Sequence, residues 1–285
     1  MTAGERRVVL ITGCSTGIGA ALAQAFHAHG DEVIATARKP ESLAALADAG
    51  MHTLALDVND PQSVEDATAR ALQLAGRVDV LVNNAGINLF GPLVELPLRE
   101  LGAVLETNVV GVMAMTQALF PSMADRGSGL VVNIGSVVGV TPTPWAGIYC
   151  ASKAAVHQLS SVLRMELAPF GIDVTVVQPG AVRSNIAQSA APAIERFAAP
   201  PSRYHRAYAG LHARTHSSQD DPMEAEDFAA QVVERVSVES PPRTIVVGGD
   251  AQRVVKMREL PDDQLELIMG AHFGLGPDFE PESES

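Results

Sequence analysis

The sequence predicts a doubly wound α/β fold, in which helices cover both faces of a parallel sheet. Short runs of β-branched and other apolar residues alternate with stretches of helix length along the first 180 residues. Near-continuous apolar runs are typical of parallel strands buried on both faces, and strand–helix alternation with right-handed crossovers gives the doubly wound plan. We expect strands at Val8–Ile11, Glu32–Thr36, Thr53–Leu56, Val78–Val82, Leu130–Ile134, Asp173–Val177 and, after an interruption, Thr244–Val247.

The helices between these strands are predicted from their apolar stripes and their ends. In Gly17–His29 the apolar residues share one helical stripe, and Gly30 is a typical C-terminal stop. Asp60 is a suitable N-cap for a helix over Pro61–Leu74, which has proline at its first position. The remaining predicted helices are Pro97–Arg126, Ala146–Phe170, Ala225–Val236 and Asp262–Met269.

The composition is that of a globular protein and excludes several classes of function. Of 285 residues, 47% are hydrophobic, and the formal net charge of −13 argues against binding to a nucleic-acid backbone. No uninterrupted apolar stretch approaches the ~18 residues of a membrane span, and no signal-peptide core precedes Val8–Ile11. Two cysteines, Cys14 and Cys150, provide neither a disulfide framework nor a zinc site. We therefore expect a soluble cytoplasmic protein that binds no metal.

A glycine-rich turn lies between the first predicted strand and the first predicted helix. Thr12-Gly-Cys-Ser-Thr-Gly-Ile-Gly19 has three glycines, which let the backbone turn tightly and approach a pyrophosphate at the helix N-terminus. Any strand-to-helix turn favours glycine, so the strand–turn–helix context is what indicates a Rossmann-type nucleotide site. The expected contacts from this turn are Gly13, Ser15, Thr16, Gly17, Ile18 and Gly19.

The end of the second predicted strand distinguishes the two nicotinamide cofactors. An acidic residue there binds the ribose of NAD, whereas an arginine accommodates the 2′-phosphate of NADP. The sequence has Ile34-Ala-Thr-Ala-Arg38-Lys39, with no acid before Glu41. Arg38 can grip a phosphate with its planar guanidinium, and Lys39 adds charge. A solvated loop is the alternative, but two adjacent bases in an acidic chain favour NADP(H).

Further residues with chemical roles recur in a specific order along the chain. The set is Thr12-Gly-x-x-x-Gly-x-Gly19, Asp57-Val58, Asn83-Asn-Ala-Gly86, Asn108, Ser136, Tyr149-x-x-x-Lys153 and Pro179-Gly180. Each element alone is common, but the set in this order and spacing is highly specific. Over residues 6–250 the sequence resembles the short-chain dehydrogenases/reductases. The resemblance implies a seven-stranded sheet in a single domain, with further cofactor contacts at Asp57, Val58, Asn84, Ala85, Gly86, Pro179, Gly180 and Val182.

A tyrosine and a lysine at helical spacing form the candidate proton-transfer pair. Tyr149 and Lys153 lie one turn apart, so both face the same way. A free phenol has a pKa near ~10, and a nearby ammonium lowers it. Such a pair can exchange a proton with a carbinol oxygen while nicotinamide carries the hydride, and Ser136 can hydrogen-bond that oxygen. An isolated Tyr-x-x-x-Lys is more often an ordinary amphipathic pair, but the nucleotide loop favours the catalytic interpretation.

Several positions keep two interpretations. The resemblance implies that Asn108 takes part in a water-mediated proton path to Lys153. It also implies that Lys153 binds the ribose of the cofactor. From the local sequence alone, Asn108 could instead be a polar residue that distorts its helix. Members of the family usually have a threonine after Pro179-Gly180 that contacts the nicotinamide, and Ser184 offers a hydroxyl there instead. Cys150 points about 100° away from the Tyr149 face, so we interpret it as a packing residue, like Cys14.

We expect a single domain over residues 1–285 with additions after its core. Its parts are a nucleotide-binding and catalytic core at 6–189, a substrate lid at 190–224, a last helix and strand at 225–249, and a C-terminal extension at 250–285. The lid prediction rests on Ala190–Asp221, which shows no clean strand and follows the sixth strand's carboxyl end, where doubly wound sheets bind ligands. Loops this long are usually functional or disordered. From Asp278 the tail is expected to fray.

The lid is rich in cations and aromatic residues, and each group has two interpretations. No acid occurs from Arg196 to Ser218, so Arg196, Arg203, Arg206 and Arg214 could receive an anionic or phosphorylated substrate and help to cover NADP. Alternatively they pair with acids elsewhere on a solvated flap. His205 lies among these arginines, and His212 and His216 have a metal-like spacing without a third ligand. The residues that either line an apolar pocket or pack in the core are Trp145, Phe197, Tyr204, Tyr208 and Leu211.

The resemblance extends to a lipid- and steroid-oriented branch of the family. Similar stretches are the Cys14 loop, Ala35-Thr-Ala-Arg38, Gly147–His157 and the long tail, and the branch includes 1-acyldihydroxyacetone-phosphate reductases and 17β-hydroxysteroid dehydrogenases. We therefore expect an NADPH-dependent reductase with Tyr149 as proton donor. Its substrate would be a bulky hydrophobic small molecule, whose ketone group is reduced to a secondary alcohol. One alternative is an NAD(P)⁺-dependent alcohol or hydroxysteroid dehydrogenase working oxidatively. Another is a non-catalytic NADP-sensing regulator.

The resemblance also implies a homodimer or homotetramer. The two long helices, Pro97–Arg126 and Ala146–Phe170, are the expected interface. Their apolar residues Val104, Val112, Met115, Leu159 and Leu163 fit core packing within one chain equally well.

Overall fold

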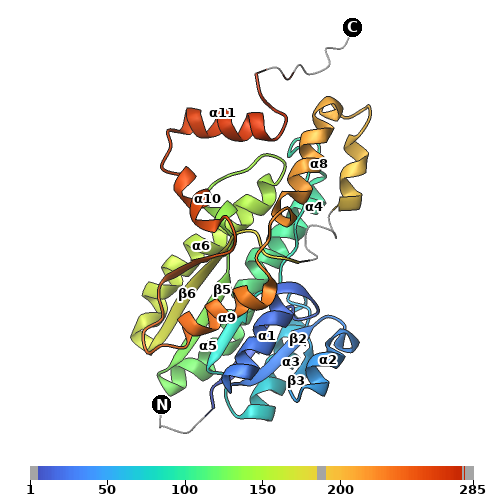
Figure 1. The fold of residues 1–285 in the computed structure, drawn as a ribbon. Helices are drawn as coiled ribbons and strands as arrows, with labels where there is room; N and C mark the ends of the chain where they lie inside the picture. Colours follow the sequence, from blue (N-terminus) through green and yellow to red (C-terminus); the bar gives the residue numbers. More distant parts are fainter. Residues whose placement is uncertain (1–5, 185–190, 278, 280–285) are drawn as a thin grey trace.

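The centre of the molecule is a seven-stranded sheet in which every strand is parallel to its neighbours. The computed structural model describes residues 6–184, 191–277 and 279, so residues 185–190 between core and lid, and most of the tail predicted to fray, lie outside the described residues. The strand order is β3-β2-β1-β4-β5-β6-β7 (Figure 1). The strands are β1 (Val8–Ile11), β2 (Glu32–Ala37), β3 (His52–Ala55), β4 (Val80–Asn83), β5 (Gly129–Ile134), β6 (Ile172–Pro179) and β7 (Thr244–Val247). The predicted fold class is confirmed.

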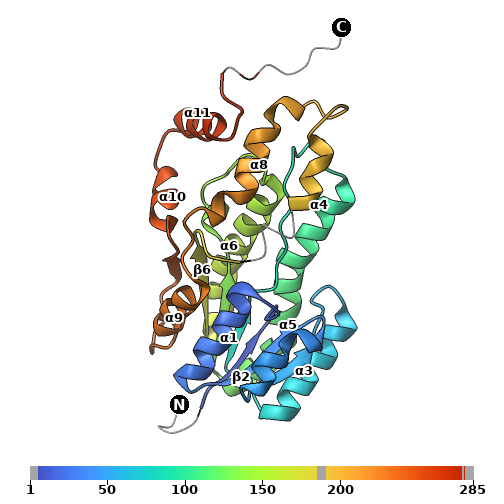
Figure 2. The same cartoon turned by 45° about the vertical axis from the view of Figure 1, so that its right-hand side comes forward.

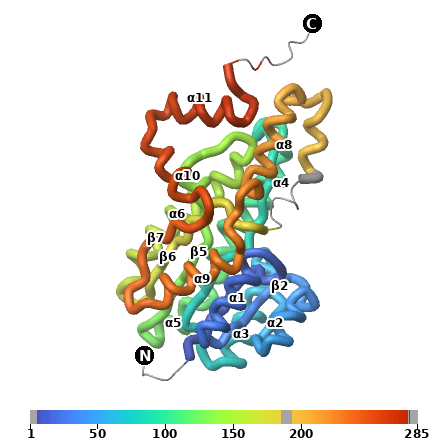
Figure 3. The backbone as a smooth tube through the Cα atoms, in the orientation of Figure 1, coloured from blue at the N-terminus to red at the C-terminus, as the bar shows by residue number. Residues whose placement is uncertain are grey.

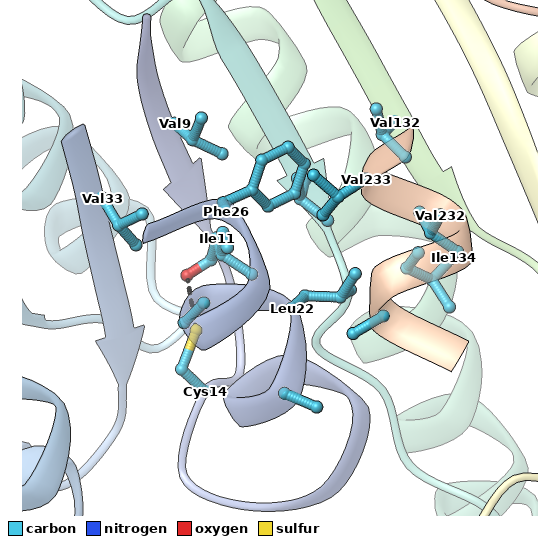
Figure 4. Packing of buried hydrophobic residues seen from close by; sticks show 14 of the residues in the cluster. Val9, Ile11, Cys14, Leu22, Phe26, Val33, Val132, Ile134, Val232 and Val233 are labelled. Atoms are coloured by element: carbon cyan, nitrogen blue, oxygen red, sulfur yellow. Dashed lines mark hydrogen bonds between the residues drawn. The ribbon is translucent and has the colours of Figure 1, made fainter. Parts of the chain in front are cut away.

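Helices cover both faces of this sheet, as its apolar strands require. The helices are α1 (Gly17–His29), α2 (Ala44–Asp48), α3 (Pro61–Ala75), α4 (Leu98–Leu105), α5 (Gly111–Arg126), α6 (Gly147–Leu167), α8 (Tyr208–His216), α9 (Ala225–Val236), α10 (Ala251–Met257) and α11 (Asp262–His272). On one face Phe26 of α1 packs with Val232 and Val233 of α9 over β1 (Figure 4). On the other, α3, α5 and α6 supply Val64, Met115 and Leu163. The strands β1 and β4 are buried throughout, as expected of the middle of such a sheet.

The apolar residues of the two long helices lie mostly in the core of one chain. Val104, Val112, Met115 and Leu163 are each at most 6% exposed, whereas Leu159 is partly exposed. By length and composition alone, Leu98–Arg126 could also cross a membrane. A helix that packs its apolar side on a sheet passes the same test, and α5 buries Leu119 at 0% exposure in this way.

The predicted Pro97–Arg126 helix is not regular. A π-helical turn at Glu106–Val110 separates α4 from α5. Asn108 lies in this turn, with a side chain that is 1% exposed. Its amide accepts a hydrogen bond from the Ile87 N–H and donates one to the Ile87 carbonyl, at 2.8 and 2.9 Å. The helix is therefore distorted at Asn108, as the second interpretation of this residue predicts. Such π turns are frequent at functional sites, so the distortion is also compatible with a role in the reaction.

Two helices have no counterpart in the predicted elements of the lid and the extension. They are α8 in the lid and α10 in the extension, whereas α11 continues the predicted Asp262–Met269 helix to His272. Figure 3 follows the chain from α8 through α9 and β7 into α10 and α11. Neither α8 nor α10 has a capping side chain. Gly210 of α8 comes so close to the Phe273 carbonyl that a Cβ would lie 2.1 Å from it. Contacts distant in sequence, rather than local pattern, hold α8 in place.

Candidate active site

A cavity of about 1470 Å³ opens at the carboxyl ends of the strands. It lies where β1 pairs with both β2 and β4, which is the point at which the strand order reverses and at which doubly wound sheets bind ligands. The structure brings almost all predicted site residues together in its lining. Those residues are Gly13, Ser15, Thr16, Gly17, Ile18, Gly19, Arg38, Asp57, Val58, Asn84, Ala85, Gly86, Ser136, Tyr149, Lys153, Pro179, Gly180, Val182 and Ser184.

Two predicted residues do not line the cavity. The side chain of Lys39 is exposed beyond the end of β2, and its carbonyl accepts hydrogen bonds from Ser42. Its neighbour Arg38 does line the cavity, and among the described residues no carboxylate pairs with it. Asn108 is buried just behind the lining. A Cβ on Gly86 would lie 3.3 Å from the Asn108 Oδ1 and 3.7 Å from the Lys153 Nζ, so both groups adjoin the same backbone.

The glycine-rich turn is held against the end of β4 by a network centred on Thr12 and Asn84. The Thr12 Oγ1 accepts from the backbone N–H groups of Asn84 and Ala85 at 3.0 and 2.9 Å. The Asn84 side chain donates to the carbonyls of Thr12 and Gly13. A Cβ on Gly19 would lie 2.2 Å from the Gly13 carbonyl, so only glycine fits there. Because no side chain caps α1 at Thr16, its first amide groups remain for an external acceptor such as a pyrophosphate.

Tyr149, Ser136 and Lys153 come together from α6 and the end of β5. Tyr149 and Ser136 both line the cavity, and the Ser136 hydroxyl acts to lower the pKa of Tyr149. The Lys153 Nζ lies 5.6 Å from the centre of the Tyr149 ring and donates to the Ile134 carbonyl at 2.8 Å. The helical spacing of Tyr149 and Lys153 thus places both side chains in the cavity, as the sequence predicts. This arrangement can present a hydroxyl donor to a substrate oxygen.

The pKa of Tyr149 is raised in this structure, whereas the proximity of Lys153 was expected to lower it. Burial raises the pKa of Tyr149 to about 12, and the charge that opposes this most strongly is Arg214. Burial also lowers the pKa of Lys153 itself to about 8. The physical reason is that desolvation disfavours the charged form of each group. At neutral pH Tyr149 is therefore a phenol, which can donate a proton but is a weak base.

His157 supports Ser136 and was not predicted from the sequence. Its Nε2 accepts a hydrogen bond from the Ser136 backbone N–H at 3.3 Å. The ring fills the space left by two glycines, because a Cβ on Gly135 or Gly139 would lie 2.3 or 2.7 Å from it. Burial and the charge of Lys153 lower the pKa of His157 to about 4, which keeps the acceptor nitrogen free of a proton. Its position eight residues after Tyr149 in α6 is the only hint that the sequence holds.

The lid arginines separate into three groups. Arg196 forms an ion pair with Glu100 at 2.7 Å. This agrees with the alternative interpretation, in which the lid arginines pair with acids elsewhere in the chain. Arg203 and Arg206 are exposed and do not line the cavity, which favours the interpretation of a solvated flap for these two residues. Arg214 is 7% exposed and does line it.

The large apolar residues of the lid, together with Trp145 before α6, belong to the core rather than to the cavity. Trp145, Phe197 and Leu211 are each at most 5% exposed and share a cluster with Phe273, and the partly buried Tyr204 and Tyr208 pack against it. The rings of His212 and His216 lie 4.4 Å apart on α8. Both cysteines are buried, and the Cys14 thiol donates to the Ile11 carbonyl at 3.3 Å (Figure 4). Burial raises the pKa of Cys14 to about 12, which fits a packing role.

The far wall of the cavity is formed by the C-terminal extension. In Figures 1 and 2, α8 and α11 lie toward the end of the molecule opposite the N-terminus, and α10 lies between α11 and α6. The apolar residues that they add to the lining are Val254, Met257, Leu260, Ile268, Met269 and Phe273. Two hydrogen bonds tie this segment to the loop before α6: the Thr141 Oγ1 donates to the Val254 carbonyl at 2.7 Å, and the Trp145 Nε1 donates to the Phe273 carbonyl at 2.8 Å.

Comparison with known proteins identifies the family. The sequence profile of the short chain dehydrogenases matches residues 7–195, which is more than half of the chain. The chain belongs to the short-chain dehydrogenase family. The predicted resemblance is thereby confirmed, and with it the prediction of an oxidoreductase.

Relatives of this short-chain dehydrogenase include enzymes named for lipid and steroid substrates. The NADPH-dependent 1-acyldihydroxyacetone phosphate reductase of Schizosaccharomyces pombe is 36% identical over 225 residues, which cover 78% of this chain and 76% of that protein. The 17-beta-hydroxysteroid dehydrogenase type 1 of Homo sapiens is 43% identical over 191 residues, which cover 63% of this chain and 58% of that protein.

Solved structures extend the similarity to almost the whole chain. A short-chain dehydrogenase from Streptomyces avermitilis has a TM-score of 0.78 and 36% identity, and the match covers 97% of this chain and all of the other. The closed form of a serine dehydrogenase complexed with NADP⁺ has a TM-score of 0.74 and 27% identity, over 85% of this chain and 94% of the other. The fold of this dehydrogenase, including its additions, therefore occurs in other members of the family.

Proposed function

We propose that the protein reduces a ketone, carried on a bulky hydrophobic molecule, to a secondary alcohol with NADPH as the hydride donor. The observation that carries the proposal is the single cavity in which Tyr149, Ser136 and Lys153 face an apolar wall from α10 and α11. The same cavity continues to the glycine-rich turn and Arg38. One site thus combines a cofactor cradle, a proton donor and space for a large substrate.

The cofactor is NADP(H), as the sequence predicts. The relative from Schizosaccharomyces pombe is named as NADPH-dependent, and solved neighbours hold NADP. The residues of this chain fit that group. Gly13, Gly17 and Gly19 line the cavity in a turn packed too closely for a side chain at Gly13 or Gly19, and Arg38 also lines the cavity, without an acidic partner among the described residues. When bound, NADPH supplies the hydride; Lys153 and Ser184 would hold its ribose and nicotinamide end.

The chain's own residues supply the proton and the orientation. Ser136 would hydrogen-bond the carbonyl oxygen, and Tyr149 would donate its phenolic proton to that oxygen as it gains charge. Because burial raises the pKa of Tyr149 to about 12, its proton is present across the neutral range, which favours the reductive direction. Lys153, with a pKa lowered to about 8, can return a proton to the phenolate. Asn108 lies behind Lys153 and would position the water that supplies it.

The size and polarity of the cavity support a large apolar substrate. Protein sites for small molecules commonly measure about 300–1,000 Å³, and this cavity of about 1470 Å³ must hold a dinucleotide as well as the substrate. Val254, Met257 and Met269 line the end away from the glycine-rich turn. The names of the relatives, which include an acyl-ketone phosphate reductase and a hydroxysteroid dehydrogenase, agree with such a substrate.

The test is a turnover assay on purified protein with a panel of ketones. The panel contains small ketones, steroid ketones and long-chain acyl ketones with and without an anionic group, each offered with NADPH and with NADH. We expect formation of a secondary alcohol with NADPH from at least one bulky ketone and slower turnover with NADH. Tight binding of NADPH without turnover of any bulky ketone would contradict the reductase proposal and favour a regulator. Faster oxidation of the alcohols with NADP⁺ would reverse the proposed direction.

Assembly and location are part of the same proposal. Leu98, Val110 and Met165 are exposed apolar residues on the two long helices, at 83%, 49% and 69%. They support a homodimer or homotetramer formed through these helices, which light scattering of the purified protein would measure. Two buried thiols and the absence of a disulfide among the described residues fit the cytoplasm, which cell fractionation would test.

A further inference from the structure

Arg214 is a buried cation in the reaction cavity. It projects from α8, is 7% exposed and lines the same cavity as Tyr149. The two side chains are close enough that the positive charge of Arg214 lowers the pKa of the phenol, against the larger effect of burial. Burying a charge is costly unless an opposite charge or strong hydrogen bonds compensate it. Whether the charge of Arg214 is already compensated within the chain, or is available to a ligand, therefore depends on its partners.

The partners of this guanidinium within the chain are neutral. Its Nε and one Nη donate to the single Oγ1 of Thr143 at 3.3 and 3.2 Å, and the other Nη donates to the Ser217 Oγ at 3.3 Å. These distances are long for hydrogen bonds that involve a charge. Among the described residues no carboxylate forms an ion pair with Arg214. The charge of Asp250 acts on Arg214, but the Asp250 Oδ1 accepts a hydrogen bond from the Ala181 N–H.

Two aromatic rings lie against the guanidinium of Arg214 but accept no hydrogen bond from it. The Cζ of Arg214 lies 5.4 Å from the centre of the Phe90 ring and 5.8 Å from that of Phe273. Such contacts stabilise a cation and exclude water, but they offer no lone pairs to its N–H donors. The guanidinium of Arg214 is thus held between two rings at the cavity wall, where its planar fork can bind a carboxylate or phosphate.

We propose that Arg214 is the anion-binding residue of the substrate site, and that the natural substrate is an amphiphilic ketone with a carboxylate or phosphate near its carbonyl group. The proposal rests on the reductase function proposed above and specifies its substrate class. The anionic group would bind the Arg214 fork beside Tyr149. The apolar remainder would lie along Val254, Met257 and Met269 of the C-terminal extension.

The other cations near the cavity do not offer the same site. Arg196 is already paired with Glu100, and Arg206 is exposed outside the lining. Arg253 lines the cavity but is exposed at its rim, where water would screen its charge. Arg206→Gln is therefore a matched control that removes a lid arginine without touching the cavity. Arg253→Gln tests whether an anion instead binds at the rim.

The test measures binding of unreactive, product-like alcohols to the protein in the presence of NADPH, so that it does not depend on turnover. The carboxylate arm compares a long-chain α-hydroxy acid with its methyl ester, and the phosphate arm compares the phosphate monoester of a long-chain diol with the free diol. Dissociation constants are measured by calorimetry for the unaltered protein and for Arg214→Gln, Arg214→Lys, Arg206→Gln and Arg253→Gln.

We expect Arg214→Gln to weaken binding of one anionic ligand about 10- to 150-fold, the loss associated with hydrogen bonds to a charged group. Binding of its neutral partner should change less than about threefold on the same scale. Arg214→Lys, which keeps the charge but not the fork, should recover part of the loss, and Arg206→Gln should bind like the unaltered protein. The arm that responds identifies the anion as carboxylate or phosphate.

Two results would overturn the inference. One is an equal loss for the neutral and anionic ligands in Arg214→Gln, accompanied by a lower melting temperature, which would make Arg214 a structural residue. The other is a selective loss in Arg253→Gln alone, which would move the anion to the rim. If anion binding depends on Arg214 but no ketone in the panel is reduced, the reductase proposal fails and the anion site stands.

Discussion

The two ends of the cavity are built in different ways. The cofactor end is made of backbone: the glycine-rich turn and the end of β4 are joined through Thr12 and Asn84, and Gly19 fits only because it has no side chain. The substrate end is made of side chains on α8, α10 and α11, which pack through a separate cluster around Trp145 and Phe273.

This difference separates an end held by contacts between neighbouring strand ends from an end held by contacts between segments far apart in the sequence. The cofactor end depends on contacts between strand ends that any member of the fold must bring together. The substrate end depends on contacts between residues more than a hundred positions apart, such as Thr141 with Val254. Changes at one end should therefore leave the other end's ligand almost unaffected, and each prediction below challenges that independence.

The largest effect is expected from a methyl group inside the glycine-rich turn. In Gly19→Ala the new Cβ would meet the Gly13 carbonyl and the Asn84 side chain, so the turn must shift away from the pyrophosphate. We expect the dissociation constant for NADPH to rise about 100-fold or more, the equivalent of losing one or two charged hydrogen bonds. Gly102→Ala is the control, because nothing lies within 4 Å of its Cβ position in α4. Equal effects of the two variants would contradict the cradle.

A smaller and more selective effect is expected at the rim of the cofactor end. Arg38→Ala should raise the dissociation constant for NADPH about 10- to 100-fold and leave that for NADH almost unchanged, because only NADPH has the 2′-phosphate. Lys39→Ala should change both by less than about threefold, since Lys39 lies outside the lining. Fluorescence titration measures both constants. If Lys39→Ala has the larger effect, the assignment of the phosphate to Arg38 is wrong.

Sequence alone predicts the cofactor end well and the substrate end poorly. Gly13, Gly17 and Gly19 lie in one short motif whose strand–turn–helix setting fixes their geometry. Tyr149 and Lys153 are likewise placed by helical spacing. Arg214 was predicted only as one of four equivalent lid arginines, because nothing local distinguishes it from Arg206. The distinction comes from Phe90 and Phe273, which lie far away in sequence.

Burial explains the other failures. The pKa of Tyr149 was expected to fall because Lys153 lies one turn away, but spacing in sequence says nothing of desolvation, which raises it. The α8 helix has no apolar period of its own, and it forms against the backbone of the extension at Gly210. The role of His157 depends on its fit beside Gly135 and Gly139, which no motif records.

At the substrate end, loosening the extension should affect bulky ketones only. Thr141→Val removes the hydroxyl that donates to the Val254 carbonyl while keeping the shape of the side chain. The loss of one buried hydrogen bond, about 1 kcal/mol, should raise KM for a bulky ketone about threefold to fivefold. KM for a small ketone and the dissociation constant for NADPH should not change. A parallel rise for the small ketone would show that the extension does not form the substrate wall.

The smallest effect concerns His157 and pH. Its pKa is lowered to about 4, below the 6.5 of an unfolded chain, so its contribution to stability is fully present above pH 6.5 and is lost as pH falls toward 4. His157→Gln keeps a hydrogen-bond acceptor that does not titrate. Melting temperatures from pH 7 to pH 4 should therefore fall less in this variant, and kcat at pH 7 should drop less than about tenfold through the shift of Ser136. An identical acid dependence in both proteins would contradict the buried neutral imidazole.

The central claim, that Tyr149 donates the proton at the junction of the two ends, is tested most directly by Tyr149→Phe. Steady-state reduction of a bulky ketone and equilibrium binding of NADPH are measured on the same preparation. We expect kcat to fall about 10²- to 10⁴-fold, the usual contribution of a positioned acid, while the dissociation constant for NADPH stays within about twofold. A variant that binds NADPH normally and still reduces the ketone at the original rate would contradict the account.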